Sequence, residues 1–185
     1  QHFRSRFEAL CKLAYENNTK LFVDAEESWI QDAIDDIAYQ NMAVYNKEKA
    51  IVYNTIQLYR KDRISEMKYR IEEARIGEYK IGFKLVRGAY MEKEANRALE
   101  FGYDNPIQNS KKDTDEDYDE AIRLCFECRD VVSFCAGTHN EKSSLFLAQL
   151  IDESDVAVND DRFWFAQLYG MSDNISYNLA AAGYN

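Results

Sequence analysis

The sequence predicts an α/β fold built from repeated strand and helix units, of the kind that forms a parallel (β/α)8 barrel. Short apolar runs rich in β-forming residues alternate along the chain with longer segments of helical periodicity. Each apolar run ends in polar residues that could bind a ligand, and the carboxyl ends of barrel strands meet on one face. The 185 residues, 46% of them hydrophobic, suffice for one domain, which we expect to span residues 1–185.

Five strands are expected, each an apolar run with a polar end. Acidic residues follow the first, Gln57 follows the second, and the tripeptide Thr-His-Asn follows the fourth. Because a complete barrel of this kind takes about 250 residues and eight strands, we expect an incomplete barrel of about five βα units. The strands are Leu21–Val23, Ile51–Ile56, Ile81–Val86, Val131–Ala136 and Phe163–Phe165.

Six helices are expected to cover the strands. Between residues 29 and 46, for example, apolar residues recur near the helical period while Asp32, Asp35 and Asp36 point outward. The stretch Asn105–Glu116 holds the only proline and is expected to be a long loop with a ligand role. The helices are Arg4–Asn17, Trp29–Asn46, Ile64–Ile76, Glu92–Phe101, Asp115–Cys128 and Lys142–Glu153.

The charge and hydropathy of the chain exclude some partners. A formal net charge of −10 argues against nucleic acid or an anionic membrane surface, both of which bind clustered Lys and Arg. No apolar run approaches the roughly 18 residues of a membrane span, and the first residues do not resemble a signal peptide. The chain begins with Gln and ends at Asn185, where another strand is expected to follow, so we expect both ends to be cuts.

The segment Lys84–Tyr90, with the sequence KLVRGAY, turns an apolar strand directly into a basic, glycine-containing and aromatic corner. This segment resembles the signature of the proline dehydrogenase family, and neighbouring segments extend the resemblance from about Lys20 to Asn185. The resemblance implies a TIM-like barrel that binds FAD, of which this chain would hold the second to the sixth strand. The family's arginine pair for the substrate carboxylate would be missing, since the sequence contains no Arg-Arg pair.

The resemblance implies that several residues at strand ends contact the flavin. Gln57 matches a position whose amide meets the flavin ring, and Lys84 matches a basic residue near N5, where positive charge favours the reduced ring. From the residues alone, Lys84 is equally a solvated edge lysine and His139 a core histidine, and these alternatives stay open. The remaining cofactor residues that the resemblance implies are Val86, Gly88, Thr138, His139, Asn140 and Gln167.

The resemblance also implies residues that face the substrate. Asp24 resembles an acid near the substrate amine, although an Asp after a strand often caps the next helix. Ala89, together with the glycine before it, leaves room for close approach to the backbone, and Tyr90 and Leu168 resemble contacts of the proline pocket. Arg87 either serves the cofactor or forms a structural ion pair.

The activity that the resemblance implies is oxidation of L-proline to pyrroline-5-carboxylate by hydride transfer to FAD, with electrons passed to a quinone. The full-length enzyme would then lie on the cytoplasmic or mitochondrial matrix side, peripheral to the inner (cytoplasmic) membrane. Two alternatives remain. The chain is an inactive fragment that self-associates through exposed sheet edges, or it is another FAD-binding barrel such as methylenetetrahydrofolate reductase, against which the KLVRGAY segment argues.

The four cysteines are expected to be reduced thiols, because the family context implies a cytosol or mitochondrial matrix, where thiols stay reduced. Cys125 and Cys128 have the C-x-x-C spacing, but without a second pair of ligands the spacing favours buried helix thiols over a metal site. The acidic run Asp113–Glu120 lacks the glycine of a calcium loop and is better explained as the solvated start of a helix. No metal site is expected.

Overall fold

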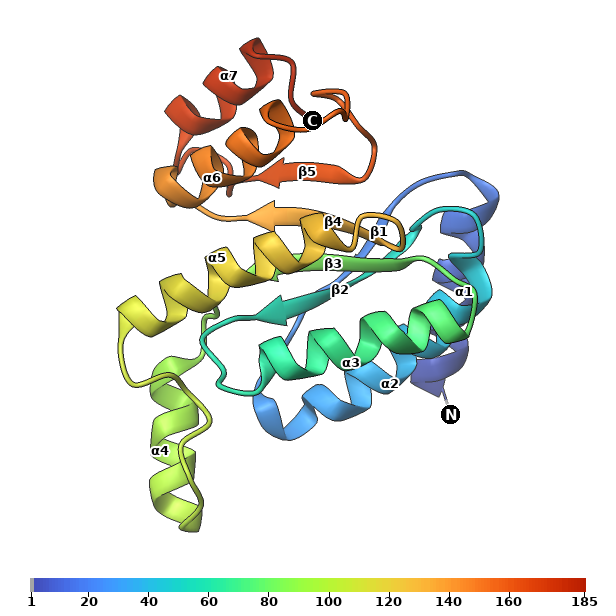
Figure 1. Cartoon of the computed structure of the whole chain (residues 1–185). Coiled ribbons are helices and arrows are strands. Elements are labelled where there is room, and N and C mark those ends of the chain that lie inside the picture. The colour runs from blue at the N-terminus through green and yellow to red at the C-terminus, as the bar shows by residue number, and fades with distance from the viewer. Residues whose placement is uncertain (1) are drawn as a thin grey trace.

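The computed structural model describes residues 2–185 and contains, within that range, one parallel sheet of five strands in the order β1-β2-β3-β4-β5. Strands that follow one another in sequence are neighbours in the sheet. Each connection therefore leads from one strand to the adjacent parallel strand, and the sheet grows in one direction (Figure 1). The predicted α/β class and incomplete barrel are confirmed. The strands are β1 (Leu21–Val23), β2 (Val52–Gln57), β3 (Ile81–Val86), β4 (Val132–Gly137) and β5 (Phe163–Ala166).

The helices agree with the prediction except at two places. In addition, Asp35 was wrongly expected to point outward: it is buried, because it pairs with Arg63 and accepts from Asn54. The predicted long loop is wrong in its second half, because α5 already begins at Lys111, where the Ser110 hydroxyl accepts a hydrogen bond from the Asp113 amide and caps the helix. Helix α7 was not predicted, since Ile175 is its one buried residue and it has no apolar stripe. The helices are α1 (His2–Glu16), α2 (Ser28–Tyr45), α3 (Arg63–Ile76), α4 (Met91–Phe101), α5 (Lys111–Glu127), α6 (Glu141–Asp152) and α7 (Asp173–Ala181).

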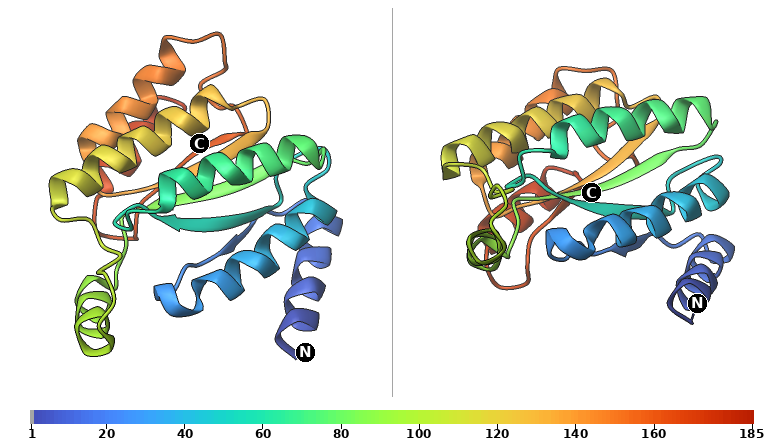
Figure 2. Two further views of the ribbon diagram at one scale, coloured as in Figure 1. Left: turned by 60° about the horizontal axis from the view of Figure 1, so that its bottom comes forward. Right: turned by 90° about the horizontal axis from the view of Figure 1, so that it is seen from below.

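The helices α2, α3, α5 and α6 wrap around the outside of the curled sheet, whereas α4 projects from the end at which the strands finish (Figures 1 and 2). Alternate side chains of each strand point outward and are buried against these helices. This outer layer includes Phe83, Leu85, Phe134 and Phe163, none of which is more than 1% exposed. The hydrophobic core therefore lies between sheet and helices and leaves the inner face for other side chains.

The inner face is arranged in levels that follow from the strand register. Thr55 pairs with Lys84, Lys84 with Cys135, and Cys135 with Trp164, so these four side chains lie at one height across the sheet. One level nearer the strand starts, a Cβ on Gly82 would lie 2.7 Å from the ring of Tyr53, so that ring fills the space above the glycine. The lower level is thus packed, and room for a ligand exists only toward the strand ends.

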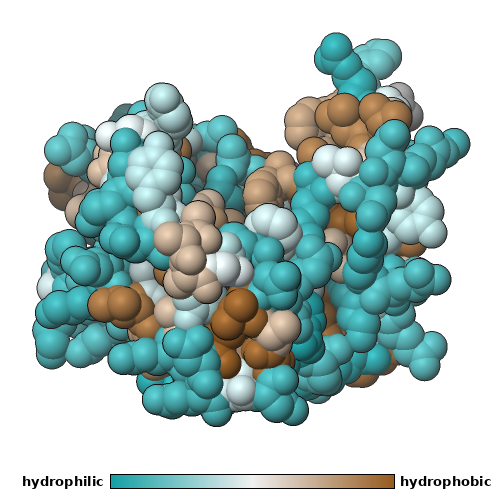
Figure 3. Space-filling view, turned by 90° about the horizontal axis from the view of Figure 1, so that it is seen from above, coloured by the Kyte–Doolittle hydropathy of each residue, from teal (hydrophilic) through white to brown (hydrophobic). Residues whose placement is uncertain are grey.

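The face of the molecule seen in Figure 3 carries mostly hydrophilic side chains, interrupted by small apolar patches. This distribution agrees with helices that have one solvated side. Within residues 2–185, no helix is both long enough and apolar enough to cross a membrane.

Candidate functional site

A cavity of about 800 Å³ lies on the inner face at the carboxyl ends of the strands. Its volume falls in the range of roughly 300–1,000 Å³ that is usual for small-molecule and cofactor sites. Every residue that the sequence analysis assigned to cofactor or substrate lines this one cavity. These residues are Asp24 after β1, Gln57 in β2, Lys84, Val86, Gly88, Ala89 and Tyr90 in and after β3, Thr138, His139 and Asn140 after β4, and Gln167 and Leu168 after β5.

Several lining residues were missed by sequence reasoning. Thr55 could have been found from alternation along β2, since it lies two residues before Gln57 and points to the same face. Glu26 had no signal beyond its acidic neighbours, and Lys111 fell in the stretch predicted as a loop with a ligand role. The missed lining residues are Ala25, Glu26, Thr55, Lys111, Gly137 and Ala166.

Lys84 and Asp24 form an ion pair in the cavity, with Nζ 2.6 Å from Oδ1. Lys84 lies on β3, the central strand, so its alternative interpretation as an edge lysine is wrong. Asp24 does not cap the following helix, whose N-cap residue is Glu27. The pair places one positive and one negative charge side by side at the level where the packed interior gives way to the cavity.

Gln57 and Tyr90 are both held by Glu26. The Gln57 side-chain amide donates to the Glu26 main-chain oxygen over 2.7 Å, and the Tyr90 hydroxyl donates to the Glu26 carboxylate over 2.9 Å. The hydrogen bond to that carboxylate is the main reason that the pKa of Tyr90 is raised. Two predicted site residues on different strand ends are therefore fixed by a third residue from the end of β1.

Gly88 makes the sharp exit from β3 toward the cavity mouth. Its φ of +125° is a conformation that L side chains rarely adopt, and an added Cβ would lie 2.5 Å from the ring of Tyr59. The backbone of Tyr59 donates to the Arg87 oxygen over 2.7 Å, which holds the two segments together. The absence of a side chain at Gly88 is what lets the chain turn here and bring the following residues to the cavity.

Arg87 also lines the cavity, and each of its three guanidinium nitrogens donates to a protein group. Its guanidinium donates to the Asp115 carboxylate (2.6 Å), the Thr138 hydroxyl (2.6 Å) and the Ser143 hydroxyl (3.0 Å), and it lies 4.2 Å above the ring centre of Tyr118. Of the two interpretations of Arg87, the structure shows the ion pair. The residue ties the end of β3 to α5, to α6 and to the segment after β4.

The segment after β4 combines capping with exposure to the cavity. Asn140 caps α6, its Oδ1 accepting from the amides of Lys142 and Ser143. The ring of His139 is exposed, and its Nδ1 is 2.9 Å from the Ser172 hydroxyl, so the core-histidine interpretation is wrong. Gln167 donates to the Thr138 oxygen over 3.2 Å.

Thr55 supplies a direct test of whether the cavity suits a polar ligand. Its side chain is only 4% exposed, and its hydroxyl has no hydrogen-bond partner among the residues that the structure describes. A buried hydroxyl without a partner is costly, so a group that bonds to Thr55 would stabilise the complex. With the Gln57 amide and the Lys84 ammonium nearby, the cavity suits a heteroaromatic ring that carries both donors and acceptors.

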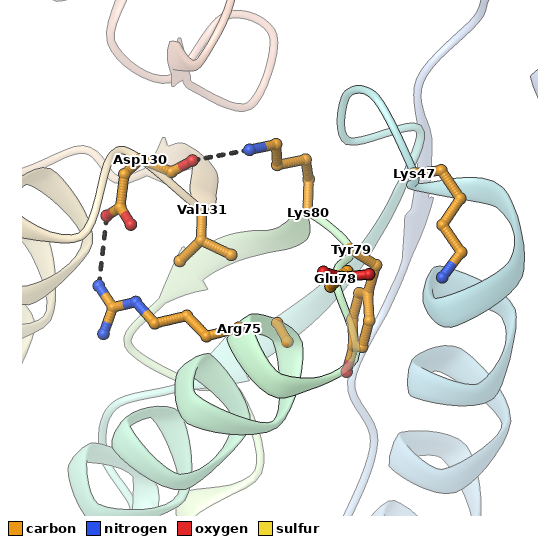
Figure 4. A pocket seen from close by; sticks show the side chains of 8 residues that line it. Lys47, Arg75, Glu78, Tyr79, Lys80, Asp130 and Val131 are labelled. Carbon is orange, nitrogen blue, oxygen red and sulfur yellow. Dashed lines mark hydrogen bonds and ion pairs between the residues drawn. The ribbon is translucent and has the colours of Figure 1, made fainter.

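A second cavity, of about 290 Å³, lies at the opposite end of the strands (Figure 4). Four of its five charged residues have partners, Glu78 being the exception among the described contacts. Arg75 pairs with the Asp130 carboxylate at 3.2 Å, Lys80 donates to the Asp130 main-chain oxygen over 2.8 Å, and Lys47 donates to the Gly77 oxygen over 3.3 Å. We therefore assign the chemistry to the larger cavity.

The C-x-x-C motif lies at the end of α5, and the four cysteines of the chain are free thiols. Burial raises the pKa of the Cys125 thiol well above its usual range, so this residue stays protonated and unreactive.

The sequence of this chain matches one known protein family over nearly its whole length. The family model described as proline dehydrogenase matches residues 2–185. Proline dehydrogenase 2, mitochondrial, of Arabidopsis thaliana is 37% identical over 185 residues, covering 97% of this chain and 39% of the relative. Human proline dehydrogenase 1, mitochondrial, is 35% identical over 182 residues, covering 97% of this chain and 30% of the relative. The chain thus spans less than two fifths of the length of these curated relatives.

Solved structures show the same fold. Proline utilization A from Bdellovibrio bacteriovorus, inactivated by N-propargylglycine, superposes with a TM-score of 0.90 at 20% identity, covering 98% of this chain and 19% of that one. At this level of identity the likeness is evidence for the fold alone.

Proposed function

Because this chain belongs to the proline dehydrogenase family, we propose that its large cavity takes part in the FAD-dependent oxidation of L-proline to pyrroline-5-carboxylate. One observation carries the proposal: the residues expected to face cofactor and substrate, although spread from position 24 to position 168, line a single cavity. We further propose that residues 1–185 act as a single, partial barrel domain.

FAD, when bound, would supply the redox chemistry, as acceptor of the hydride from C5 of proline and donor of electrons to a quinone. The chain's own residues hold and tune the ring. Lys84 puts a positive charge where negative charge accumulates on reduction, and the amide of Gln57 offers donor and acceptor atoms to the ring edge. Thr55, whose hydroxyl has no protein partner among the described residues, would donate a hydrogen bond to the ring. The remaining cofactor-side residues of the proposal are Val86, Gly88, Thr138, His139, Asn140 and Gln167.

The proposed substrate-facing residues line the same cavity, next to the cofactor-facing ones in space or in the chain. The Asp24 carboxylate orients the cationic amine of proline, and Lys84 beside it keeps that carboxylate in place. Tyr90 and Leu168 provide apolar surface for the proline ring, while Ala89 is small enough to admit it. Such positioning and the exclusion of water supply the protein's share of catalysis.

We propose for the full-length protein a place on the matrix or cytoplasmic side of the inner membrane, as a peripheral protein. Support comes from the relatives named above as mitochondrial, and the proposed transfer of electrons to a quinone would require contact with a membrane. A different FAD-binding barrel, such as methylenetetrahydrofolate reductase, is not favoured, because the family match extends over residues 2–185.

The test is an anaerobic absorbance titration of the chain with FAD and then with L-proline. We expect the flavin bands to shift on binding and to bleach when proline is added, which would mean that the arginine pair missing from this sequence is not essential for reduction. Binding without bleaching would favour the inactive-fragment alternative, and a failure to bind FAD would overturn the proposal. Asp24→Asn should keep FAD binding and weaken the response to proline, whereas Asp130→Asn, at the opposite end of the strands, should change neither.

A further inference from the structure

Glu26 lies in the short loop between β1 and α2, and its main chain is held from below by a buried polar network. Its amide donates to Gln31 Oε1 over 2.9 Å, and Gln31 Nε2 donates to Asp35 over 2.7 Å. Asp35 in turn pairs with Arg63 at 3.3 Å and accepts from Asn54 over 2.6 Å. Because all of these partners are buried, the loop is pre-organised before any ligand arrives.

The main-chain oxygen of Glu26 orients the amide of Gln57. A carbonyl oxygen can only accept, so the 2.7 Å contact must be made by Gln57 Nε2. This hydrogen bond therefore fixes the orientation of the Gln57 amide and leaves the amide oxygen and one N–H free to bind a ligand. An untethered glutamine could present either end.

The carboxylate of Glu26 orients the phenol of Tyr90, which is half-buried and follows the Gly88 turn. Two further contacts press the start of α4 against the same loop: Lys93 lies 2.9 Å from the Glu27 carboxylate, and the buried Glu94 carboxylate accepts from the Ser28 amide over 2.6 Å. The segment that carries Tyr90 is thereby docked on the loop, and Glu26 determines where its ring points.

We infer that Glu26 is a positioning residue of the proposed site, which sets the orientation of the substrate-facing phenol of Tyr90 through its carboxylate and of the cofactor-facing amide of Gln57 through its carbonyl. This inference rests on the proposed function. Glu26 links a proposed cofactor-facing residue to a proposed substrate-facing one without having to touch either molecule.

The two contacts of Glu26 can be tested separately, because a substitution of Glu26 removes the carboxylate that binds Tyr90 but keeps the carbonyl that binds Gln57. In a double-variant cycle, Glu26→Ala and Tyr90→Phe should each raise the KM for L-proline by a similar factor, roughly five- to tenfold for the loss of one hydrogen bond, with little change in kcat. The double variant should be no worse than either single variant, since both break one contact. The FAD dissociation constant, from quenching of flavin fluorescence, should not change in Glu26→Ala.

Two control variants sharpen this test. Glu26→Gln should restore most of the KM, because the amide oxygen still accepts from the phenol. Asp32→Asn removes the same charge from an exposed residue of α2 that does not line the cavity, and it should leave the KM unchanged. An unchanged KM in Glu26→Ala, or additive effects in the double variant, would overturn the inference.

A readout that needs no turnover tests the contact itself. The charged and titratable groups that face the Tyr90 hydroxyl are Glu26, Glu27 and Lys93. With 3-fluorotyrosine at position 90, the single ¹⁹F signal should titrate at a lower pH in Glu26→Ala than in the unaltered protein. Equal titration would overturn the role of Glu26 while leaving the proposed function intact. An unaltered chain that binds FAD but is not reduced by proline would instead overturn the proposed function, and with it this inference.

Discussion

Lys84 owes its place in the cavity to the register of β3, which turns its side chain toward the inner face beside Asp24. The Asp24 side chain is 75% exposed, and an ion pair so open to water contributes at most about 1 kcal/mol to stability. The pair is therefore better suited to placing charge for a ligand than to holding the fold. A ligand can displace it at little cost.

We predict that Lys84→Met weakens FAD binding, or slows its reduction by L-proline, by about tenfold, the effect of losing one hydrogen bond to a charged group. Flavin fluorescence and anaerobic stopped-flow absorbance measure the two quantities. Lys80→Met, at the other end of the same strand, serves as the control. Unchanged affinity and unchanged reduction in Lys84→Met would contradict the assignment of Lys84.

Gly88→Ala should lower the free energy of unfolding by about 2–4 kcal/mol, since it combines backbone strain at positive φ with overlap on the Tyr59 ring. Urea unfolding measures the change. At Gly102, which has φ +70° but no atom within 4 Å of an added Cβ, the same substitution should cost only about 1–2 kcal/mol. Equal losses at both glycines would mean that the contact with Tyr59 is unimportant.

At the scale of elements, the connections between strands and helices are held by single charged residues with several bonds. Arg87 joins β3 to α5 and α6, and Arg162 joins the loop before β5 to the segment before β4 by donating to Asp160 and to the Arg129 oxygen over 2.9 Å. A planar guanidinium carries five N–H donors in a fixed fork and can hold several acceptors in set directions, whereas lysine has three donors on one flexible nitrogen. The positions of the strand ends therefore depend on few side chains.

Asp160 should make stability depend on pH. Hydrogen bonds from Arg162 are the main cause that lowers the pKa of Asp160 in the folded state. The unfolded chain then binds the proton more tightly, so the stabilisation is complete above the unfolded pKa of about 4 and is lost as the pH falls through the folded pKa. Urea unfolding between about pH 6 and pH 3 should show a shallower acid loss in Asp160→Asn. Arg162→Met should likewise make the acid loss of the free energy of unfolding shallower. A loss that is unaltered in both variants would contradict the prediction.

At the scale of the whole molecule, the curled sheet has two edges within residues 2–185, β1 and β5. The edge at β5 is partly covered by the chain itself, because the Phe165 amide donates to the Asn185 oxygen over 3.0 Å and Asn185 Nδ2 donates to the Phe163 oxygen over 3.3 Å. The edge at β1 is short, and its Phe22 is 42% exposed. Short and covered edges limit pairing between chains but do not abolish it.

Self-association through the sheet edges remains a prediction, and β1 is the edge at which it should occur. Sedimentation of the chain over a range of concentrations should show a mass that rises above that of one 21.6 kDa chain. Phe22→Lys places a charge on this edge and should shift the equilibrium toward the monomer. Leu99→Lys, on the exposed side of α4, is the control. A mass that stays at one chain at all concentrations would contradict the prediction.

The sequence by itself determined the strands, most helices and the family, because these depend on local patterns. Apolar runs that end in polar residues mark the carboxyl ends of strands, and in a parallel sheet those ends must meet. For this reason Gln57, Lys84 and His139 could be placed at one site before any contact was known. Helix α7 was not predicted because its surface is almost wholly solvated, so its sequence shows no periodic pattern of apolar residues.

Only the tertiary structure decided how the site residues are held. Tyr90 meets Glu26 from 64 positions away, Arg87 meets Thr138 and Ser143 from the next strand unit, and Gly88 is needed because the ring of Tyr59 lies beneath it. No local pattern encodes such pairs, since each requires the strands first to be stacked in register. Which side chains gather in the cavity could be predicted from the chain, whereas their pre-organisation arises from contacts between residues that folding alone brings together.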